Sequence, residues 1–391
     1  KALKESLIDK DQASIKDFLF SRQSWDYITE SYRRNCPQIS FLDYFWLVRN
    51  MHIPLYKVLS LINRLPKVKV VHSISTGYAG FLGSLLHHKY HYPFILTEHG
   101  IYVKERKIDL LQGQWTAVGN FVQQRETITQ QYMTDQWINF FIILARFCYA
   151  AADPVISLFS DCQKRQIQDG ASEAKTMIVP NGVNVTRDPP SKKSPASNNP
   201  VIGLIGRVVP IKDIKNLIRA MVLVKKMIPD AVAWIIGPTD EDPGYYTECK
   251  ELVDVLGLKD QIIFKGMQQI ANILPELDLL VLSSISEALP LVILEAFDAG
   301  VPVVATDVGA CRELIYGFKE EDKTLGEAGI VVEIANADAL ANGIIAMLTD
   351  KIRWQEAQVA ARKRVLQHYS MEQFVANYNH IYQKALAEWQ G

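Results

Sequence analysis

Short apolar runs alternate with helical segments throughout the second half of the chain, and this alternation constrains the fold more than any other feature. The runs cover residues 201–205, 231–236, 261–264, 279–282, 301–304 and 330–332. Such runs are typical of buried strands, and strands that alternate with helices form parallel sheets with helices on both faces. We therefore expect an α/β, doubly wound domain in this half.

A second sheet is expected in the first half. Its strand-like runs are residues 68–71, 94–96, 155–158 and 177–179. A helical segment begins near Tyr78, between the first two runs, which makes them a β-α-β unit. Residues 1–65 have a helical and aromatic character, so we expect a helical insertion ahead of this sheet.

The chain is long enough for two domains. It has 391 residues, and 48% of them are hydrophobic, which is enough for two ordinary cores. Residues 186–200 are rich in Pro, Ser and Asn, as linkers are. A capping box over residues 370–373 opens a last helix. We expect a first domain over 1–190, a linker over 191–200, a second domain over 201–369 and a terminal helix over 370–391 that packs back on the first domain.

The charge balance gives no sign of a nucleic-acid or membrane-surface partner. The chain has 42 basic and 43 acidic side chains, so any phosphate site must be local. Its most apolar stretch, residues 137–147, is too short to span a bilayer and contains Arg146. We expect a buried helix there and no transmembrane segment.

The cysteines are scattered without metal-ligand spacing. They are Cys36, Cys148, Cys162, Cys249 and Cys311. An odd number without paired spacing favours a reducing cytoplasm over a disulfide framework. Cys311 lies near an expected helix start, where a thiol can be reactive, but a packing role is favoured.

Two glutamates bracket the turn that follows the run at 279–282. Glu287 comes just before the expected helix start, and Glu295 lies inside the helix, eight residues on. Ligands of open α/β sheets collect beyond the carboxyl ends of strands, where helix N–H groups favour anions. The turn therefore suits a phosphorylated ligand, with glutamates that can accept hydrogen bonds from sugar hydroxyls. The alternative is a dipole-favoured carboxylate and a solvated helix residue.

A glycine followed by basic residues ends the run at 201–205. Gly206 allows a tight turn and the close approach of a ligand. Arg207 offers a bidentate fork and Lys212 a point charge, the two usual ways of holding a diphosphate. The spacing fits neither the dinucleotide-binding glycine pattern nor the P-loop, so neither function is indicated.

Three weaker candidates remain. His99 directly follows an expected strand, where it is either a ligand or a histidine satisfied by backbone groups. Glu98 and the charged run 104–107 could face an acceptor, although such runs are usually solvated. Asp240 and Asp242 have the spacing of a metal site, but the prolines around them favour a turn, and no metal is expected.

Together these motifs resemble those of retaining glycosyltransferases of family 4. The match rests on Glu287 with Glu295, Gly206-Arg207 with Lys212, Thr97 with His99, and Pro180-Asn181-Gly182. Residues 97–102, 206–213, 241–243 and 307–314 look like those of the PelF-type glycosyltransferases of Pel exopolysaccharide biosynthesis. The resemblance covers nearly the whole chain and implies the GT-B fold, in which two Rossmann-like domains face each other across a donor cleft.

The resemblance also implies residue roles. Arg207 and Lys212 would hold the donor diphosphate, and Glu287 would lie by the transferred sugar. Glu295 would hold the ribose hydroxyls, and His99 would approach the sugar from the first domain. The further donor-binding positions are Gly206, Gly266, Met267, Leu291 and Val292.

The chain departs from the family pattern in two places. Ala288-Leu289-Pro290 replaces the common Gly-Phe-Gly, and since proline has no N–H, phosphate contacts must come from Leu291 and Val292. The first strand and the Gly-rich loop of the family are not evident before residue 68, and the chain opens on Lys1. We therefore expect the first strand of the first domain to be missing, and sugar transfer to suffer more than nucleotide binding.

The resemblance implies a metal-independent enzyme without a cofactor that transfers a hexose from a UDP-sugar, UDP-glucose favoured, to a growing polysaccharide with retention. Such an enzyme would be cytoplasmic, or peripheral at the inner membrane beside the partners of a synthase complex. Two alternatives stay open. One is a nucleotide-sugar-binding subunit without turnover, and the other is a nucleotide-sugar epimerase on the same fold.

Overall fold

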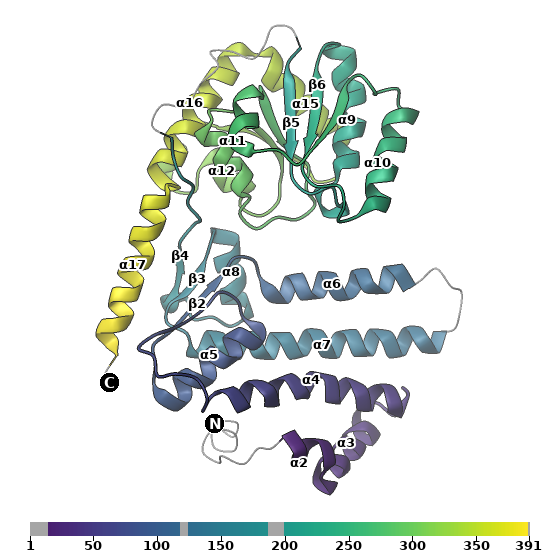
Figure 1. The fold of residues 1–391 in the computed structure, drawn as a ribbon, viewed down its shortest axis with the longest axis vertical. Helices are drawn as coiled ribbons and strands as arrows, with labels where there is room; N and C mark the ends of the chain where they lie inside the picture. Colours follow the sequence, from purple (N-terminus) through teal and green to yellow (C-terminus); the bar gives the residue numbers. More distant parts are fainter. Residues whose placement is uncertain (1–14, 118–123, 187–198, 390–391) are drawn as a thin grey trace. The chain divides into compact units, whose positions relative to one another are not determined.

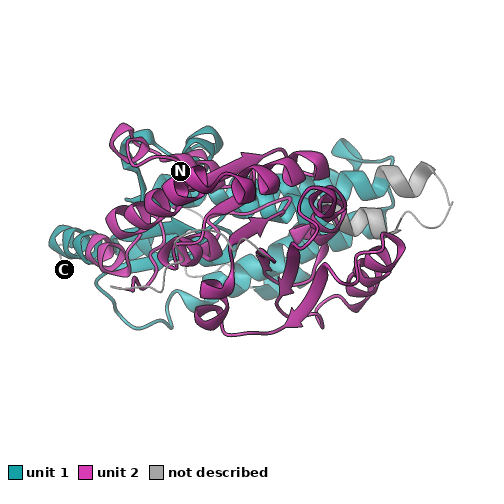
Figure 2. Cartoon of the chain, turned by 90° about the horizontal axis from the view of Figure 1, so that it is seen from above, with its two compact units in different colours: residues 1–157, 162–178, 379–391 teal, residues 158–161, 179–378 magenta. Residues whose placement is uncertain are grey.

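The computed structural model describes residues 15–117, 124–186 and 199–389, and the chain divides into two compact units (Figure 2). Unit 1 contains the described residues of Lys1–Ser157, Cys162–Ile178 and Asn379–Gly391. Unit 2 contains those of Leu158–Asp161 and Val179–Tyr378. Most of the expected linker, residues 191–200, lies outside the described residues.

Unit 1 holds a parallel sheet with the strand order β1-β2-β3-β4. The strands are β1 (Val71–Ser73), β2 (Phe94–Glu98), β3 (Val155–Ser157) and β4 (Thr176–Ile178). The expectation of a strand at 68–71 is wrong by three residues, because backbone pairing with β2 begins only at Val71. The prediction began too early because β-branched residues before Val71 favour a strand, and propensity does not show where the partner strand begins.

The helices of unit 1 include those expected at its start. They are α2 (Ile15–Phe20), α3 (Arg22–Asn35), α4 (Phe41–Leu61), α5 (Gly77–Tyr90), α6 (Tyr102–Ala117), α7 (Gln124–Ala151), most of α8 (Ser160–Asp169) and the short η1 (Glu173–Lys175). The apolar stretch 137–147 lies in α7, which packs against α4, α5 and α6 (Figure 1). None of the helices in the described part of the chain is long and apolar enough to cross a membrane.

Unit 2 holds the predicted doubly wound sheet, with the strand order β10-β9-β8-β5-β6-β7. The strands are β5 (Val201–Ile205), β6 (Val232–Ile236), β7 (Ile262–Gly266), β8 (Leu279–Leu282), β9 (Val303–Thr306) and β10 (Gly329–Val332). Successive residues of a strand point to opposite faces, and Leu279 and Leu280 are both fully buried. Both faces of the sheet are therefore covered, as the continuous apolar runs predicted.

The strand order of unit 2 reverses between β5 and β8. From β5 the chain adds β6 and β7 on one side, and then returns to place β8, β9 and β10 on the other. The helices are α9 (Ile214–Met227), α10 (Pro243–Val255), α11 (Ile270–Ile273), α12 (Leu291–Asp298), α13 (Cys311–Tyr316), α14 (Glu320–Lys323), α15 (Ala337–Thr349) and α16 (Lys351–His368), with the short η2 (Pro210–Lys212) and η3 (Leu274–Glu276). In Figure 1, α9 lies between α10 and α15, while α12 packs on α16.

The last helix, α17 (Met371–Glu388), begins in unit 2 and ends in unit 1. Its predicted capping box is half present, because the Ser370 hydroxyl accepts the Gln373 N–H at 3.3 Å. Within unit 1, the Tyr382 hydroxyl lies 2.7 Å from Nδ1 of His72 on β1. The domain bounds proposed from the sequence stay a prediction.

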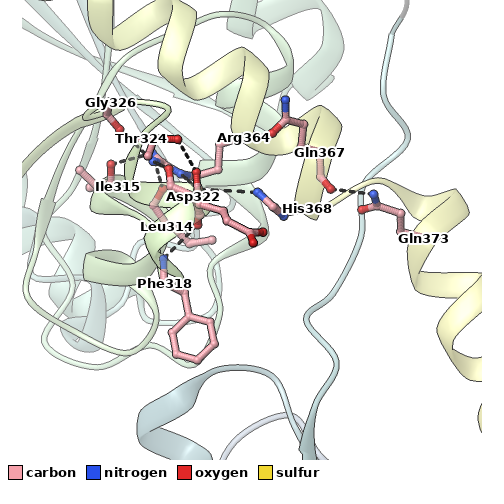
Figure 3. Close-up of polar contacts among 11 residues, drawn as sticks. Leu314, Ile315, Phe318, Asp322, Thr324, Gly326, Arg364, Gln367, His368 and Gln373 are labelled. Carbon is pink, nitrogen blue, oxygen red and sulfur yellow. Dashed lines mark hydrogen bonds and ion pairs between the residues drawn. The ribbon is translucent and has the colours of Figure 1, made fainter.

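A buried arginine joins α16 to the segment that follows α13 (Figure 3). The Arg364 guanidinium has no exposed surface and donates to Oδ1 of Asp322 at 2.6 Å. It also donates to backbone carbonyls of Leu314, Ile315, Asp322 and Gly326. The other Asp322 oxygen accepts the Phe318 N–H at 2.9 Å. A single side chain thus satisfies acceptors that would otherwise be buried without a partner.

Candidate functional site

Two loops meet where the strand order of unit 2 reverses. One follows β5 and contains Gly206 to Asp213, and the other follows β8 and precedes α12. The Ser283 hydroxyl donates to the Lys212 carbonyl at 2.8 Å, and the Ile285 N–H donates to the Ile211 carbonyl at 2.9 Å. These bonds hold the two loops together at the switch point, where ligands of open α/β sheets bind.

Lys212 and Glu287, both expected in the site, form an ion pair across these loops. Lys212 Nζ lies 2.6 Å from Glu287 Oε1, which also accepts the Ser284 hydroxyl at 2.7 Å. Their side chains are only 20% and 15% exposed, so water screens the pair weakly. The pair holds the ammonium group of Lys212 in place at the switch point.

A glycine that the sequence reasoning did not single out supports this pair. Gly309, after β9, has φ +53°, and a Cβ there would lie 2.2 Å from the Ala288 carbonyl oxygen. The next N–H, that of Ala310, donates to the same oxygen at 2.8 Å. The strand-ending pattern Asp307-Val308-Gly309 was the available signal, because a glycine after a parallel strand often marks a close backbone approach.

Arg207 lies on the exposed side of the same site. Its guanidinium pairs with Glu241 from the loop after β6, and both side chains are about half exposed, at 54% and 48%. Gly206 packs against Gly237, where a Cβ would lie 2.0 Å from the Gly206 carbonyl oxygen. The turn is therefore restricted to small residues, while the arginine remains accessible to a ligand.

The start of α12 supplies backbone donors. No hydrogen bond among the described residues uses the N–H of Leu291 or Val292, and Leu291 is exposed. Glu295, one turn further on, is partly buried, and this burial raises the pKa of its carboxyl group. Its side chain likewise has no hydrogen bond to another described residue. A ligand at this helix start would meet free N–H groups and a carboxylate.

Gly266 and Met267, two of the predicted donor-binding residues, lie at the last position of β7 and directly after it. Gly266 has φ +63° and no atom within 4 Å of the place where a Cβ would lie. Its carbonyl accepts the Gly237 N–H at 2.9 Å, which ties this end to the Gly206 turn. The Met267 side chain is 74% exposed. An exposed apolar side chain beside open backbone suits the flat face of a base.

Two candidates lie on unit 1, and only one is accessible. His99 follows β2 and its side chain is exposed. The suggestion that Glu98 faces an acceptor is wrong, because its side chain has no exposed surface. It accepts hydrogen bonds from the side chains of Thr76, Tyr149 and Gln166. Both faces of β2 are buried, so Glu98 is buried with the rest of the strand, and this burial raises the pKa of its carboxyl group.

The remaining candidates have structural roles. Asp242 caps α10 by accepting the Tyr245 N–H at 3.0 Å, as its turn context predicted. The described residues contain no group of His, Cys, Asp and Glu that could hold a metal ion. Cys311 is fully buried at the start of α13, and burial raises its pKa to about 12, so it packs rather than reacts.

Comparison with known proteins assigns the two halves separately. Residues 187–364 match the family described as glycosyl transferases group 1. This part of the chain, which contains most of unit 2, is therefore similar to group 1 glycosyl transferases. Residues 1–174 match a domain of unknown function (DUF3492). Nothing in these matches ties the chain to the PelF type or to family 4.

Several curated relatives are named as glycosyltransferases, which indicates that this chain is a transferase. Alpha-maltose-1-phosphate synthase of Mycolicibacterium smegmatis is 25% identical over 84% of this chain and 82% of that protein. The mannosyltransferase LpsB of Rhizobium meliloti, of lipopolysaccharide core biosynthesis, is 30% identical over 50% of this chain and 57% of its own. The chain thus spans little more than half of LpsB.

Solved structures establish the fold. HepE of Anabaena in complex with UDP-glucose aligns with a TM-score of 0.60 at 19% identity, over 85% of this chain and 82% of that one. Sucrose-phosphate synthase of Thermosynechococcus elongatus aligns with a TM-score of 0.62 at 21% identity, over 86% and 79%. The chain has the α/β GT-B fold with two parallel-sheet domains, as expected.

Proposed function

We propose that this glycosyltransferase transfers a hexose from a UDP-sugar, UDP-glucose favoured, to a growing exopolysaccharide with retention of configuration. The observation that carries the proposal is the Lys212–Glu287 pair at the switch point of unit 2. It lies in the loops that also bear Arg207 and the free N–H groups at the start of α12. This is a site for a diphosphate with a sugar attached.

The chemistry asks mainly for stabilisation of the departing diphosphate. Arg207 provides a guanidinium fork, Lys212 a positioned ammonium group and α12 its first N–H groups. Donors that are already in place when charge develops on the leaving group contribute most to the rate. Glu287, paired with Lys212, contacts the transferred sugar and is not required as a nucleophile. On unit 1, His99 is exposed, and it is the residue we assign to the transfer step.

The choice of donor is supported by two kinds of observation. Glu295 is placed one turn into α12 with a free carboxyl group, as a ribose contact requires. The HepE structures that share the fold contain UDP, UDP with glucose, and UDP-glucose. The relatives also include a galactosyltransferase of Escherichia coli named for UDP-Gal, so the hexose itself must be tested.

Variants at the site should separate diphosphate contacts from sugar contacts. We expect Arg207→Ala and Lys212→Ala to weaken UDP and UDP-glucose alike, by about tenfold or more, because each removes a charge-assisted contact of about 1.5–3 kcal/mol. Glu287→Ala removes the partner that positions Lys212, so it should weaken UDP to a small extent and UDP-glucose clearly more. Calorimetric titration of both ligands checks this.

Equal losses for UDP and UDP-glucose in Glu287→Ala would contradict the assignment of Glu287 to the sugar. Turnover assays then separate the alternatives. Tight UDP binding without product from any acceptor would favour a binding subunit. Release of nucleotide that depends on an acceptor would exclude an epimerase.

Donor binding should survive chelation of metal ions. Arg207, Lys212 and the N–H groups of α12 provide the positive charge that a divalent cation would otherwise bring. We expect the same UDP affinity by calorimetry with and without excess EDTA. A loss on chelation that Mg²⁺ or Mn²⁺ restores would contradict metal independence and point to Asp240 and Asp242.

A further inference from the structure

Glu98 is a fully buried carboxylate outside the proposed donor site. No cation neutralises it among the described residues that contact it. Its hydrogen bonds instead come from neutral donors at 2.7–3.5 Å. They are the Thr76 hydroxyl, the Tyr149 hydroxyl, the Gln166 side-chain amide and the Tyr102 N–H. A carboxylate is costly to bury, so a shell of donors from four helix segments implies a specific task.

Two of these donors begin helices at the carboxyl edge of the sheet. Thr76 is the N-cap residue of α5, and Tyr102 is the first residue of α6. Each binds the same oxygen, Oε1, so one atom links the loop after β1 to the loop after β2. Gly77 reinforces the link, because its φ is +67° and a Cβ there would lie 2.8 Å from the Tyr102 ring.

The other carboxylate oxygen, Oε2, is held by residues of two further helices. The Tyr149 hydroxyl on α7 donates to Oε2 at 2.7 Å, and the Gln166 amide on α8 donates to it at 3.1 Å. Gln166 also donates to the Ile156 carbonyl of β3. The backbone at Glu98 therefore cannot turn without breaking contacts to several elements. His99, the next residue, is exposed at the start of the loop that this carboxylate holds.

We propose that Glu98 is a positioning residue that acts through His99, by locking the loops after β1 and β2 of unit 1 and so fixing the backbone from which His99 acts in sugar transfer. The proposal rests on the proposed function. It goes further because it makes the rate of sugar transfer, and not the affinity for the nucleotide, depend on a buried carboxylate of unit 1. Glu98 itself touches no substrate.

Glu98→Gln tests the proposal, because it keeps the shape of the side chain but replaces one acceptor oxygen with a donor group. Hydrogen exchange needs no turnover and is measured first. The Gly80 N–H donates to the Thr76 carbonyl, and the Glu105 N–H donates to the Ile101 carbonyl. These two bonds close the first turns of α5 and α6. We expect exchange at both amides to rise about tenfold in the variant, and exchange in unit 2 to stay unchanged.

Kinetics then test whether Glu98 acts through His99. We expect Glu98→Gln to lower kcat/KM about 10- to 100-fold, since small misplacements of a positioned group have effects of this size. UDP affinity should be unchanged. In a His99→Ala background the same substitution should change kcat/KM less than about twofold, because its target is already absent.

Two further variants distinguish a positioning effect from a general loss of stability. Tyr149→Phe removes a single donor to Oε2 and keeps the ring, so it should reproduce the effects of Glu98→Gln at smaller size. Asp278→Asn is the matched control. Asp278 is a fully buried carboxylate of unit 2 that accepts the Val201 N–H at 2.8 Å. Its substitution should lower stability without coupling to His99→Ala.

Unchanged exchange at Gly80 and Glu105 would overturn the proposal, and so would equal losses of kcat/KM with and without His99. These outcomes differ from a failure of the proposed function. If Arg207→Ala and Lys212→Ala bind UDP as well as the unchanged protein, the donor site is wrong, whatever the exchange of unit 1 shows.

Discussion

Replacing Arg364 with methionine should lower the free energy of unfolding by about 3–5 kcal/mol, the usual loss when one member of a buried ion pair is removed. The substitution removes the guanidinium from the Asp322 carboxylate, which is only 5% exposed, and leaves it with the imidazole of His368, whose Nε2 lies 3.9 Å away. It also leaves carbonyls of Leu314, Ile315 and Gly326 without their donor. For a unit of about 200 residues, we expect the melting temperature to fall by about 10 °C.

Arg353→Met is the control for this prediction. Arg353 pairs with Glu327 at 3.6 Å on the surface, where the side chains are 44% and 62% exposed. Such a pair contributes at most about 1 kcal/mol. A loss for Arg364→Met no larger than for Arg353→Met, measured by calorimetry, would show that the buried pair does not hold α16 to the segment after α13.

Turnover should fall about 10²- to 10³-fold when Lys212 is replaced by methionine, as when a donor to developing charge is lost. Methionine keeps most of the length of the side chain but removes the ammonium group that lies 2.6 Å from Glu287. Glu287 would keep its hydrogen bond from Ser284, so the fold should persist. Release of UDP from UDP-glucose in the presence of acceptor measures the effect.

Lys215→Met is the matched control. Lys215 lies three residues further on, in the first turn of α9, and pairs with the exposed Glu248. It should be replaceable with less than about a twofold effect, because an exposed pair contributes little. Comparable losses of turnover at both positions would mean that general positive charge, and not a positioned ammonium group, stabilises the leaving group.

Much of the secondary structure of unit 2 could be predicted from local sequence patterns. Each expected run of the second half forms a strand. Asp242 accepts a backbone N–H at the start of α10, as the turn residues around it indicated. The residues of the proposed donor site were candidates from the sequence, because glycine, arginine and glutamate follow the ends of its expected strands. The first strand of unit 1 was misplaced, since only its partner decides where pairing begins.

Contacts between distant residues could not be predicted from the sequence. Lys212 and Glu287 were candidates, but their pairing at 2.6 Å depends on two loops that the sheet order brings together. Gly309 was not a candidate, because the need for glycine there comes from the Ala288 carbonyl oxygen, which lies on another loop. Glu98 was expected to face an acceptor and is instead buried, because nothing in the sequence indicated the donors that surround its carboxylate.

The sequence by itself determined the parallel α/β architecture with two sheets, and it supplied the candidate residues of the proposed diphosphate site. These follow from periodicity and from chemistry that neighbouring residues share. Only the tertiary structure decided which charges meet and which are buried, as with Arg364 and Asp322, 42 residues apart. Burial and pairing depend on how elements pack, and a pattern along one segment does not carry that information.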